Sequence, residues 1–284
     1  MSNLKTKALL VQLAVSQWTA RKKDKRATQQ VEQANHAASG VGGYHKSLLP
    51  VGDALKNIQQ KTTTIRNKFY KNTLPWGVDG TYILPTANYM DFMAEFSKDK
   101  SEWHTLVDTF LNKYSHMVEQ AEQALGDMFN QDEYPPVDVV AQKFNIDLAA
   151  FPVPADDFRV DLSDAQVAAV RQDVEDRVNS AAEAAMNAAW QRLYDKVEHI
   201  HEKLSDPSAI YRDTLIENAR ELVDLLPKLN FADDPELDRM RNEVSKKLTS
   251  HDAESLRVDP DLRRETAGDA KAIMDKMSIF MGGA

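Results

Sequence analysis

The first hydrophobic pattern along this chain has a period of two residues. Leu9, Val11, Leu13 and Val15 alternate with smaller or more polar neighbours, which predicts a β-strand because successive side chains of a strand point to opposite faces. A polar helix to about residue 35 and a glycine-rich loop, HAASGVGGYH, are predicted next. From about residue 51 to 72 the period changes to three and four residues, which predicts an amphipathic helix. Its stripe is Leu55, Ile58, Thr62, Ile65 and Phe69.

The segment TLPWGVDGTYILP, residues 73–85, interrupts the helical pattern. Its two prolines do not fit a helix interior, and its two glycines allow a turn with positive φ. The TYIL sequence within it favours a strand, which we expect to pair with the first strand. Trp76 and Tyr82 would then cover the edge of a small sheet. A ligand-binding loop is the alternative, but the segment brings together no convergent charged groups.

Two long helices dominate the rest of the pattern. From about Asn88 the chain returns to helix, and a stripe with intervals of three and four residues from Trp103 to Met128 predicts a helix of roughly eight turns. Ser163 is a suitable N-cap for a second helix that runs to Leu204, about 60 Å long. The mean spacing of its apolar stripe is about 3.7 residues, typical of a nearly straight helix. Its middle, SAAEAAMNAAW, consists mostly of small residues.

Shorter elements are predicted around and after the long helices. Val137 to Phe144 favours a short helix, and FPVPADDFRV an extended segment. A further helix is expected to end near Leu225, ahead of Pro227. Another begins at Pro235 with Asp233 or Asp234 as its cap. The last helix ends in MDKMSIFMGGA, a strongly apolar sequence that we expect to dock on its own core or on another subunit.

These elements together predict the fold class. We expect a mainly α protein, an elongated long-helix bundle or coiled-coil-like arrangement with a small N-terminal β element of two or three short strands. The 284 residues divide into a basic N-terminal α+β unit, 1–87, and an acidic long-helix domain, 88–284. The sequence contains no repeat of 20–50 residues, so it does not indicate a solenoid.

Composition limits the environment and the chemistry. The chain has no cysteine, which excludes disulfides and thiolate catalysis and is typical of a reducing cytosol. No run of apolar residues reaches the length that a membrane span requires, and the first residues have no signal-peptide cleavage pattern. We therefore expect a soluble, cytoplasmic protein that does not bind membranes.

Charge is distributed unevenly along the chain. Residues 1–71 contain 13 Lys and Arg but only three acidic residues, whereas the remainder contains 22 basic and 41 acidic residues. Such a separation indicates a basic face for a polyanion or an acidic partner. The alternative is that the two segments neutralise each other within the fold or between subunits.

Motifs for catalysis and metal binding are missing from the sequence. His199 and His201 lie two positions apart on a predicted helix, so they cannot chelate one ion. Glu198 and His201 match the Glu-x-x-His spacing of di-iron bundles, but no second such pair exists. No G-x-S-x-G, Walker A or G-x-G-x-x-G sequence is present. We expect no enzyme activity, no cofactor and no metal; an enzyme built around the 73–85 segment is the open alternative.

The basic residues indicate single-stranded nucleic acid as one candidate ligand. Cations that follow phosphates, with aromatic rings on which bases stack, are the components of such sites, and Trp18, Phe69, Tyr70 and Trp76 lie nearby in sequence. A solvated helix face would show the same lysines. The candidate residues are Arg21, Lys22, Lys23, Lys25, Arg26, Lys61, Arg66, Lys68 and Lys71.

Oligomerisation is the first functional hypothesis. Small residues on the long helix let a partner backbone approach closely, and the apolar C-terminus requires a docking surface. The chain would then be a non-enzymatic assembly or adaptor subunit of a homo-oligomer. The candidate contact residues are Ala181, Ala185, Ala189, Met277 and Phe280.

The order of three sequence features resembles a known family. LAVSQW followed by ARK, the TLPW…G-Y-ILP corner and LVDLLPKLNFADDPEL are similar to an uncharacterised family of bacteriophages and bacteria, catalogued as a domain of unknown function. Its members are encoded beside a MoxR-type AAA+ ATPase and a von Willebrand A-domain protein. The resemblance implies an accessory component of a phage or bacterial ATPase system, with these two proteins as partners and, if phage-encoded, the host cytoplasm as location. It implies no catalytic residues.

Overall fold

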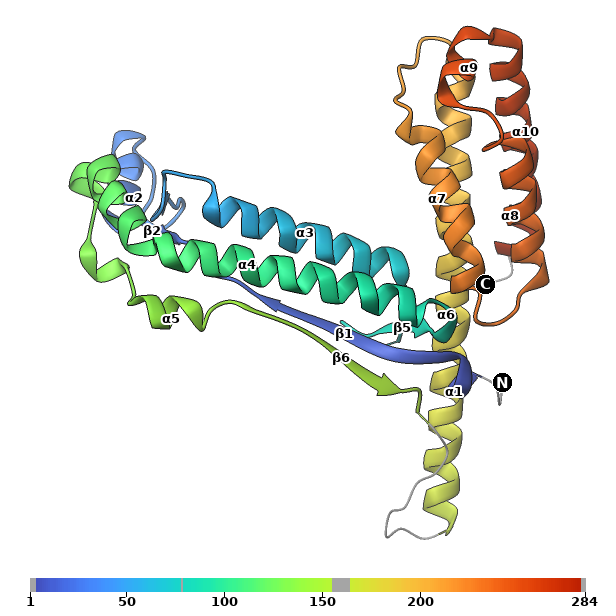
Figure 1. Ribbon diagram of the computed structural model, residues 1–284, viewed down its shortest axis with the longest axis horizontal. Helices are drawn as coiled ribbons and strands as arrows, with labels where there is room; N and C mark the ends of the chain where they lie inside the picture. The colour runs from blue at the N-terminus through green and yellow to red at the C-terminus, as the bar shows by residue number, and fades with distance from the viewer. Residues whose placement is uncertain (1–3, 78, 155–163, 282–284) are drawn as a thin grey trace. The chain divides into compact units, whose positions relative to one another are not determined.

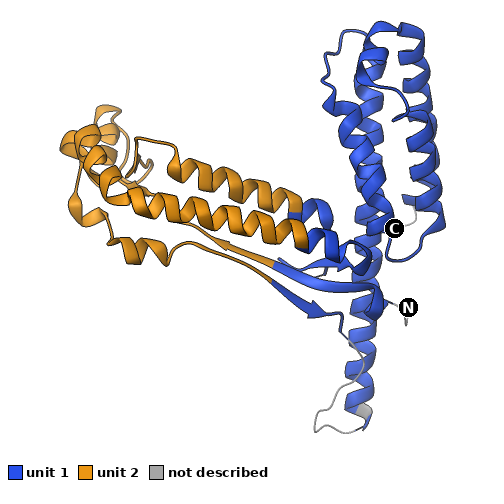
Figure 2. Cartoon of the chain, in the orientation of Figure 1, with its two compact units in different colours: residues 1–12, 69–93, 149–284 blue, residues 13–68, 94–148 orange. Residues whose placement is uncertain are grey.

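The computed structural model describes residues 4–77, 79–154 and 164–281. The protein is mainly α and contains one four-stranded antiparallel sheet (Figure 1). The chain forms two compact units (Figure 2). Unit 1 consists of Met1–Gln12, Phe69–Met93 and Ala149–Ala284, and unit 2 of Leu13–Lys68 and Ala94–Leu148. These units do not coincide with the predicted division between residues 87 and 88.

The sheet contains the predicted N-terminal strand and the predicted corner. Its order is β4-β5-β1-β6, where β1 is Ala8–Ser16, β4 is Leu74–Pro75, β5 is Tyr82–Pro85 and β6 is Asn145–Pro152. Strand β5 pairs antiparallel with β1 and with β4, so the expected pairing of TYIL with the first strand is confirmed. Gly80 takes a positive φ of 77° in the turn. Strand β6 was not predicted, and of the extended segment the structure describes only the residues up to Pro154.

Unit 1 contains most of the helices of the second half of the chain. The short α1 is Leu4–Lys7, and α6 is Asp164–Ser205. Helix α6 packs against α7 and α10. Together with α8 and α9, these helices enclose one hydrophobic core. Leu193, Val197 and Ile200 of α6 are buried in this core. The remaining bounds are α7 Thr214–Leu229, α8 Pro235–Lys247, α9 Ala253–Val258 and α10 Pro260–Met281.

Two of the expected helix ends can be checked. The prediction that a helix ends near Leu225 is wrong, because α7 continues through Pro227 to Leu229. Leu226 and Leu229 are both buried, and their burial offsets the cost of a proline in the last turns. Asp234 caps α8 by accepting hydrogen bonds from the backbone N–H groups of Glu236 and Leu237, as predicted. The predicted cap Ser163 lies outside the described residues.

The 73–85 corner packs against α6 and hydrogen-bonds to it within unit 1. Leu74 and Trp76 are buried, and the backbone N–H of Trp76 donates to the Thr81 carbonyl at 3.0 Å. Arg192 of α6 donates to the Thr73 carbonyl at 2.6 Å. A Cβ atom placed on Gly77 would lie only 3.4 Å from Cβ of Ala181. The corner is therefore a structural part of the core, as the first of the two interpretations predicted.

Unit 2 contains a helix pair with a buried polar network. Helix α3 is Ala54–Asn72 and α4 is Thr86–Leu125; both begin or end in unit 1 but lie mostly in unit 2. Trp103 of α4 is fully buried and donates from Nε1 to Oγ1 of Thr62 at 2.8 Å. The Thr62 hydroxyl in turn donates to Gln17 at 3.0 Å. This chain of bonds satisfies the indole N–H, which would otherwise destabilise the core.

Helix α2 and strand β2 of unit 2 lie near one end of α4 (Figure 1). Strand β2 and strand β3 form a separate two-stranded antiparallel sheet, which was not predicted. Two 3₁₀ turns and a short helix follow α4. The bounds are β2 Arg21–Lys23, α2 Lys25–Ala34, β3 His45–Ser47, η1 Gly126–Met128, η2 Gln131–Glu133 and α5 Val137–Ala141.

Candidate functional site

Five of the predicted nucleic-acid-binding cations lie together in unit 2. Arg21, Lys22 and Lys23 form β2, and Lys25 and Arg26 begin α2. All five are exposed. No ion pair joins any of them to a residue that the structure describes; the amino group of Lys23 donates a long hydrogen bond to the Gly42 carbonyl, at 3.4 Å. We call these five residues the basic cluster.

Asp24 and Glu32, the two acidic residues closest in sequence to the basic cluster, form structural contacts. Asp24 caps α2, and the pKa of its carboxyl is lowered by the backbone N–H of Ala27 and also by Lys46. Glu32 is buried and accepts hydrogen bonds from the backbone N–H groups of Gly40 and Gly42 at 2.9 and 3.2 Å. Both carboxylates therefore hold the backbone in place, and neither forms an ion pair with a cation of the basic cluster.

The sheet under the basic cluster is fixed by a buried lysine and a buried tyrosine. Lys46 is 5% exposed and forms ion pairs with Glu133 at 2.7 Å and Asp24 at 3.6 Å. The Tyr134 hydroxyl donates to the Leu48 carbonyl at 2.8 Å, and burial raises the pKa of Tyr134 to about 12. The contacts of Lys46 and Tyr134 thus stabilise a sheet whose two strands have only three polar or charged residues each.

The predicted cations of α3 are placed differently. Lys61 and Lys68 both bind the carboxylate of Asp99, at 2.7 and 2.8 Å. Burial alone would raise the pKa of Asp99, but the hydrogen bonds from the two lysines outweigh it and lower the pKa. Arg66 is exposed on the same helix. Within unit 1, Lys71 pairs with Glu221 at 2.6 Å. Internal pairing, the alternative considered for the charge pattern, therefore applies to Lys61, Lys68 and Lys71 but not to the basic cluster.

The aromatic rings that were expected near the cations are mostly packed inside the protein. In unit 1, Phe69 and Trp76 are buried, whereas Tyr70 is 46% exposed and lies 5.3 Å from the ring of Tyr82. In unit 2, Trp18 contacts Tyr114 at 5.8 Å between ring centroids.

One exposed ring does lie beside the basic cluster, and the sequence analysis missed it. The side chain of Tyr44 is 44% exposed, and its carbonyl accepts a hydrogen bond from the backbone N–H of Asp24 at 2.9 Å. Its position after a glycine-rich loop gave no periodic signal.

The predicted oligomerisation residues lie mainly in the core of unit 1. Ala181, Ala185, Ala189 and Met277 are buried there. Phe280 is 41% exposed, and its ring stacks on Trp190 with 5.6 Å between centroids. The small residues thus let elements of the same chain approach α6, as Gly77 does at Ala181.

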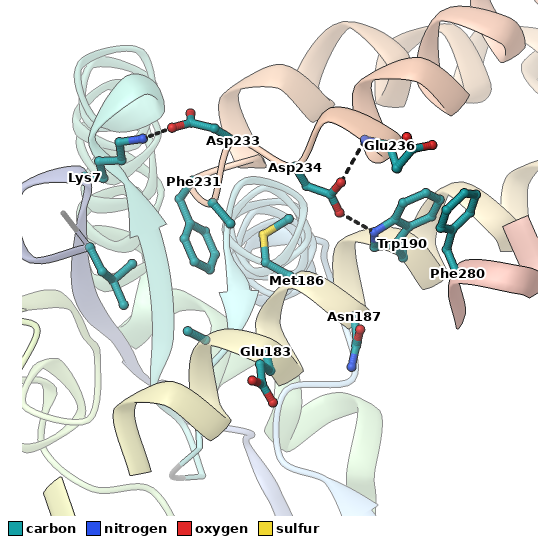
Figure 3. Close-up of a pocket in the computed structure, with 13 residues that line it drawn as sticks. Lys7, Glu183, Met186, Asn187, Trp190, Phe231, Asp233, Asp234, Glu236 and Phe280 are labelled. Carbon is teal, nitrogen blue, oxygen red and sulfur yellow. Dashed lines mark hydrogen bonds and ion pairs between the residues drawn. The ribbon is translucent and has the colours of Figure 1, made fainter. Parts of the chain in front are cut away.

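Unit 1 has a cavity of about 820 Å³ between α6, the chain near Lys7, the α7–α8 connection and the end of α10 (Figure 3). Its apolar lining comes from Leu4, Met186, Trp190, Phe231 and Phe280. Its polar lining is Lys7, Glu183, Asn187, Asp233, Asp234 and Glu236. Neither the alternation nor the helical periodicity predicted this cavity, because its walls come from four separate segments.

Two contacts fix the rim of this cavity (Figure 3). The indole N–H of Trp190 donates to the carboxylate of Asp234 at 2.8 Å, which places the ring against the capped end of α8. Lys7 forms an ion pair with Asp233, a residue with a positive φ of 55°. The rim thus joins the N-terminal segment to the α7–α8 connection.

Among the residues that the structure describes, no group of three or more His, Asp or Glu side chains could hold a metal ion. His201 has its Nδ1 at 3.0 Å from the Ala267 carbonyl, and His199 lies near Glu202. Over the same part of the chain, no helix has the length and apolar character needed to span a bilayer.

Comparisons with protein families, with curated proteins and with solved structures find no match to this chain.

Proposed function

We propose that this protein is a non-enzymatic binding protein that contacts single-stranded nucleic acid through the basic cluster and Tyr44. The observation that carries the proposal is the difference between two groups of cations in unit 2. Lys61 and Lys68 bind carboxylates of α4, whereas the basic cluster has no acidic partner among the described residues.

The charge of unit 2 makes this difference informative. Unit 2 contains 14 Lys and Arg and 14 Asp and Glu, so its net charge does not favour a polyanion by itself. The attraction for phosphate groups comes instead from the local excess of positive charge at the basic cluster, beside carboxylates that already accept hydrogen bonds from the backbone. Tyr44 adds an exposed ring on which a base can stack, which favours a single strand over a duplex.

Replacing all five residues of the basic cluster with alanine should abolish oligonucleotide binding. If each cation contacts one phosphate, the affinity of the unmodified protein should fall roughly 100-fold between about 50 and 200 mM salt. Fluorescence anisotropy with labelled single-stranded and duplex oligonucleotides measures both effects. Tyr44→Ala should weaken binding of the single strand more than binding of the duplex, because stacking needs unpaired bases.

A second alanine variant controls for the loss of charge alone. It removes five exposed cations of unit 2 that lie outside the basic cluster, and we expect it to bind with nearly unchanged affinity. Equal losses in the two variants, or unchanged binding after replacement of the basic cluster, would contradict the proposal. The control residues are Lys56, Arg66, Lys98, Lys113 and Lys143.

An assembly or adaptor role is the second candidate. It is supported by the N-terminal part of α6, where Val167, Val170 and Val174 are at least partly exposed at coiled-coil spacing. A second copy could pack there, and the family resemblance suggests the AAA+ ATPase and the von Willebrand A-domain protein as further partners.

We expect a mass above that of one chain in size-exclusion chromatography with light scattering at high micromolar concentration and low salt. A strict monomer under these conditions would remove the self-association part of the assembly role. It would leave the nucleic-acid proposal unaffected, because that role requires only one chain.

A further inference from the structure

We propose that the cavity of unit 1 binds an organic cation: a primary ammonium or guanidinium group carried on an apolar body. This site is separate from the basic cluster and takes a ligand of opposite charge. The ligand would be either a small amine or a lysine or arginine side chain of a peptide beside an apolar residue.

The size and the floor of the cavity fit the apolar body. Its volume of about 820 Å³ lies in the range of ligand pockets. Met186, Trp190 and Phe231 form the floor and are each less than 10% exposed, so their positions are fixed by the core. Phe280 stacks on Trp190 and extends the apolar wall. Aromatic and methionine side chains favour an apolar or aromatic ligand that also carries a positive charge.

The rim selects the sign of the charge. Four carboxylates, from Glu183, Asp233, Asp234 and Glu236, line the cavity against one lysine, Lys7. Asp234 is already occupied by Trp190 and by the backbone N–H groups of α8, and Glu236 pairs with Arg239.

Glu183 is exposed and has no ion pair with any residue in the described ranges. It is therefore the carboxylate that is free to bind a cation. Asp233 is the second, because its side chain is 75% exposed and its ion pair with Lys7 is therefore weak in water.

Two ligands with the same apolar body and opposite charge test the inference. We expect 4-phenylbutylamine to shift the indole N–H resonance of Trp190, assigned with the variant Trp190→Phe, while the indole resonances of Trp18, Trp76 and Trp103 stay in place. We expect 4-phenylbutyrate to bind at least tenfold more weakly. The capped tripeptide Phe-Lys-Phe provides a second arm that distinguishes a peptide from a small amine as the ligand.

Two rim variants should change amine affinity in opposite directions. Lys7→Met removes the one cation and frees Asp233, so the amine should bind about threefold more tightly. Glu183→Gln should weaken amine binding by a similar factor. Glu175→Gln, on an exposed part of the same helix outside the cavity, should have no effect on binding.

Binding of either cationic probe supports the inference, and the arm that binds identifies the ligand class. The inference is wrong if neither probe moves the Trp190 resonance, if the carboxylate binds as well as the amine, or if Lys7→Met and Glu183→Gln leave amine affinity unchanged. All of these measurements use the folded full chain, and its unchanged circular dichroism spectrum verifies that each variant is folded.

Discussion

Replacing Asp99 with asparagine should lower the free energy of unfolding by roughly 3 kcal/mol, because it removes one partner of a buried ion pair. The Asp99 side chain is 6% exposed and binds both Lys61 and Lys68. The neutral amide accepts a hydrogen bond but cannot compensate two cations between α3 and α4. Urea denaturation followed by circular dichroism measures the change.

The same carboxylate gives the protein a predictable pH dependence. The pKa of Asp99 is lowered in the folded state by the hydrogen bonds and charges of Lys61 and Lys68, which outweigh its burial. A lowered pKa means that this contribution to stability is present above the ordinary aspartate pKa and is lost as pH falls through the folded value. Asp99→Asn should therefore flatten the decrease in stability in acid.

Glu102→Gln provides the matched control for Asp99. Glu102 also binds Lys61 and also has a lowered pKa, but its side chain is 49% exposed. Water screens and replaces exposed charges, so we expect little change in the urea midpoint. If Glu102→Gln and Asp99→Asn were equally destabilising, burial would not be the reason for the effect.

The parts of the fold that follow from local periodicity were predictable. Strand β1 and its pairing with the corner came from an alternation of apolar residues, and the long helices came from stripes that extend over many turns. Leu193, Val197 and Ile200 lie on the apolar stripe of α6 and are buried, because burial along a helix follows the 3.6-residue period.

The strands that were missed have no such signal. Strand β2 is Arg-Lys-Lys with all three side chains exposed. Its sheet is stabilised by the contacts of Lys46 and Tyr134, which no alternation of apolar and polar residues indicates. In β6 only Ile146 is fully buried, so its alternation is too short to distinguish a strand from a loop. Tertiary contacts, not local preference, form both elements.

The charge pattern was informative only in part, for a similar reason. The excess of cations in residues 1–71 is visible in the sequence, but Lys61 and Asp99 are 38 residues apart and their pairing depends on the fold. The sequence could therefore select candidate cations for binding, but could not separate those that bind carboxylates from those that stay exposed. The cavity of unit 1 could not be predicted for the same reason, because its lining comes from several separate segments.

The second large effect on stability is expected from a substitution at one of the small residues of α6. Ala185→Leu should lower the free energy of unfolding by about 1–3 kcal/mol, because a larger side chain cannot be placed in a packed core without strain. Ala185 is fully buried in unit 1. Urea denaturation at several protein concentrations measures the loss, which should be the same at each concentration because the strained contacts lie within one chain.

The neighbouring position provides a control with the identical chemical change. Ala184 lies one residue away on the same helix and is exposed, so Ala184→Leu should alter stability by no more than about 0.5 kcal/mol. The comparison also decides between two uses of the small residues. If Ala185 faced a second subunit, Ala185→Leu would lower the mass measured by light scattering and its effect would grow on dilution. A destabilisation that is independent of concentration means instead that the small residues serve packing within the chain, and self-association would then have to use the exposed N-terminal part of α6.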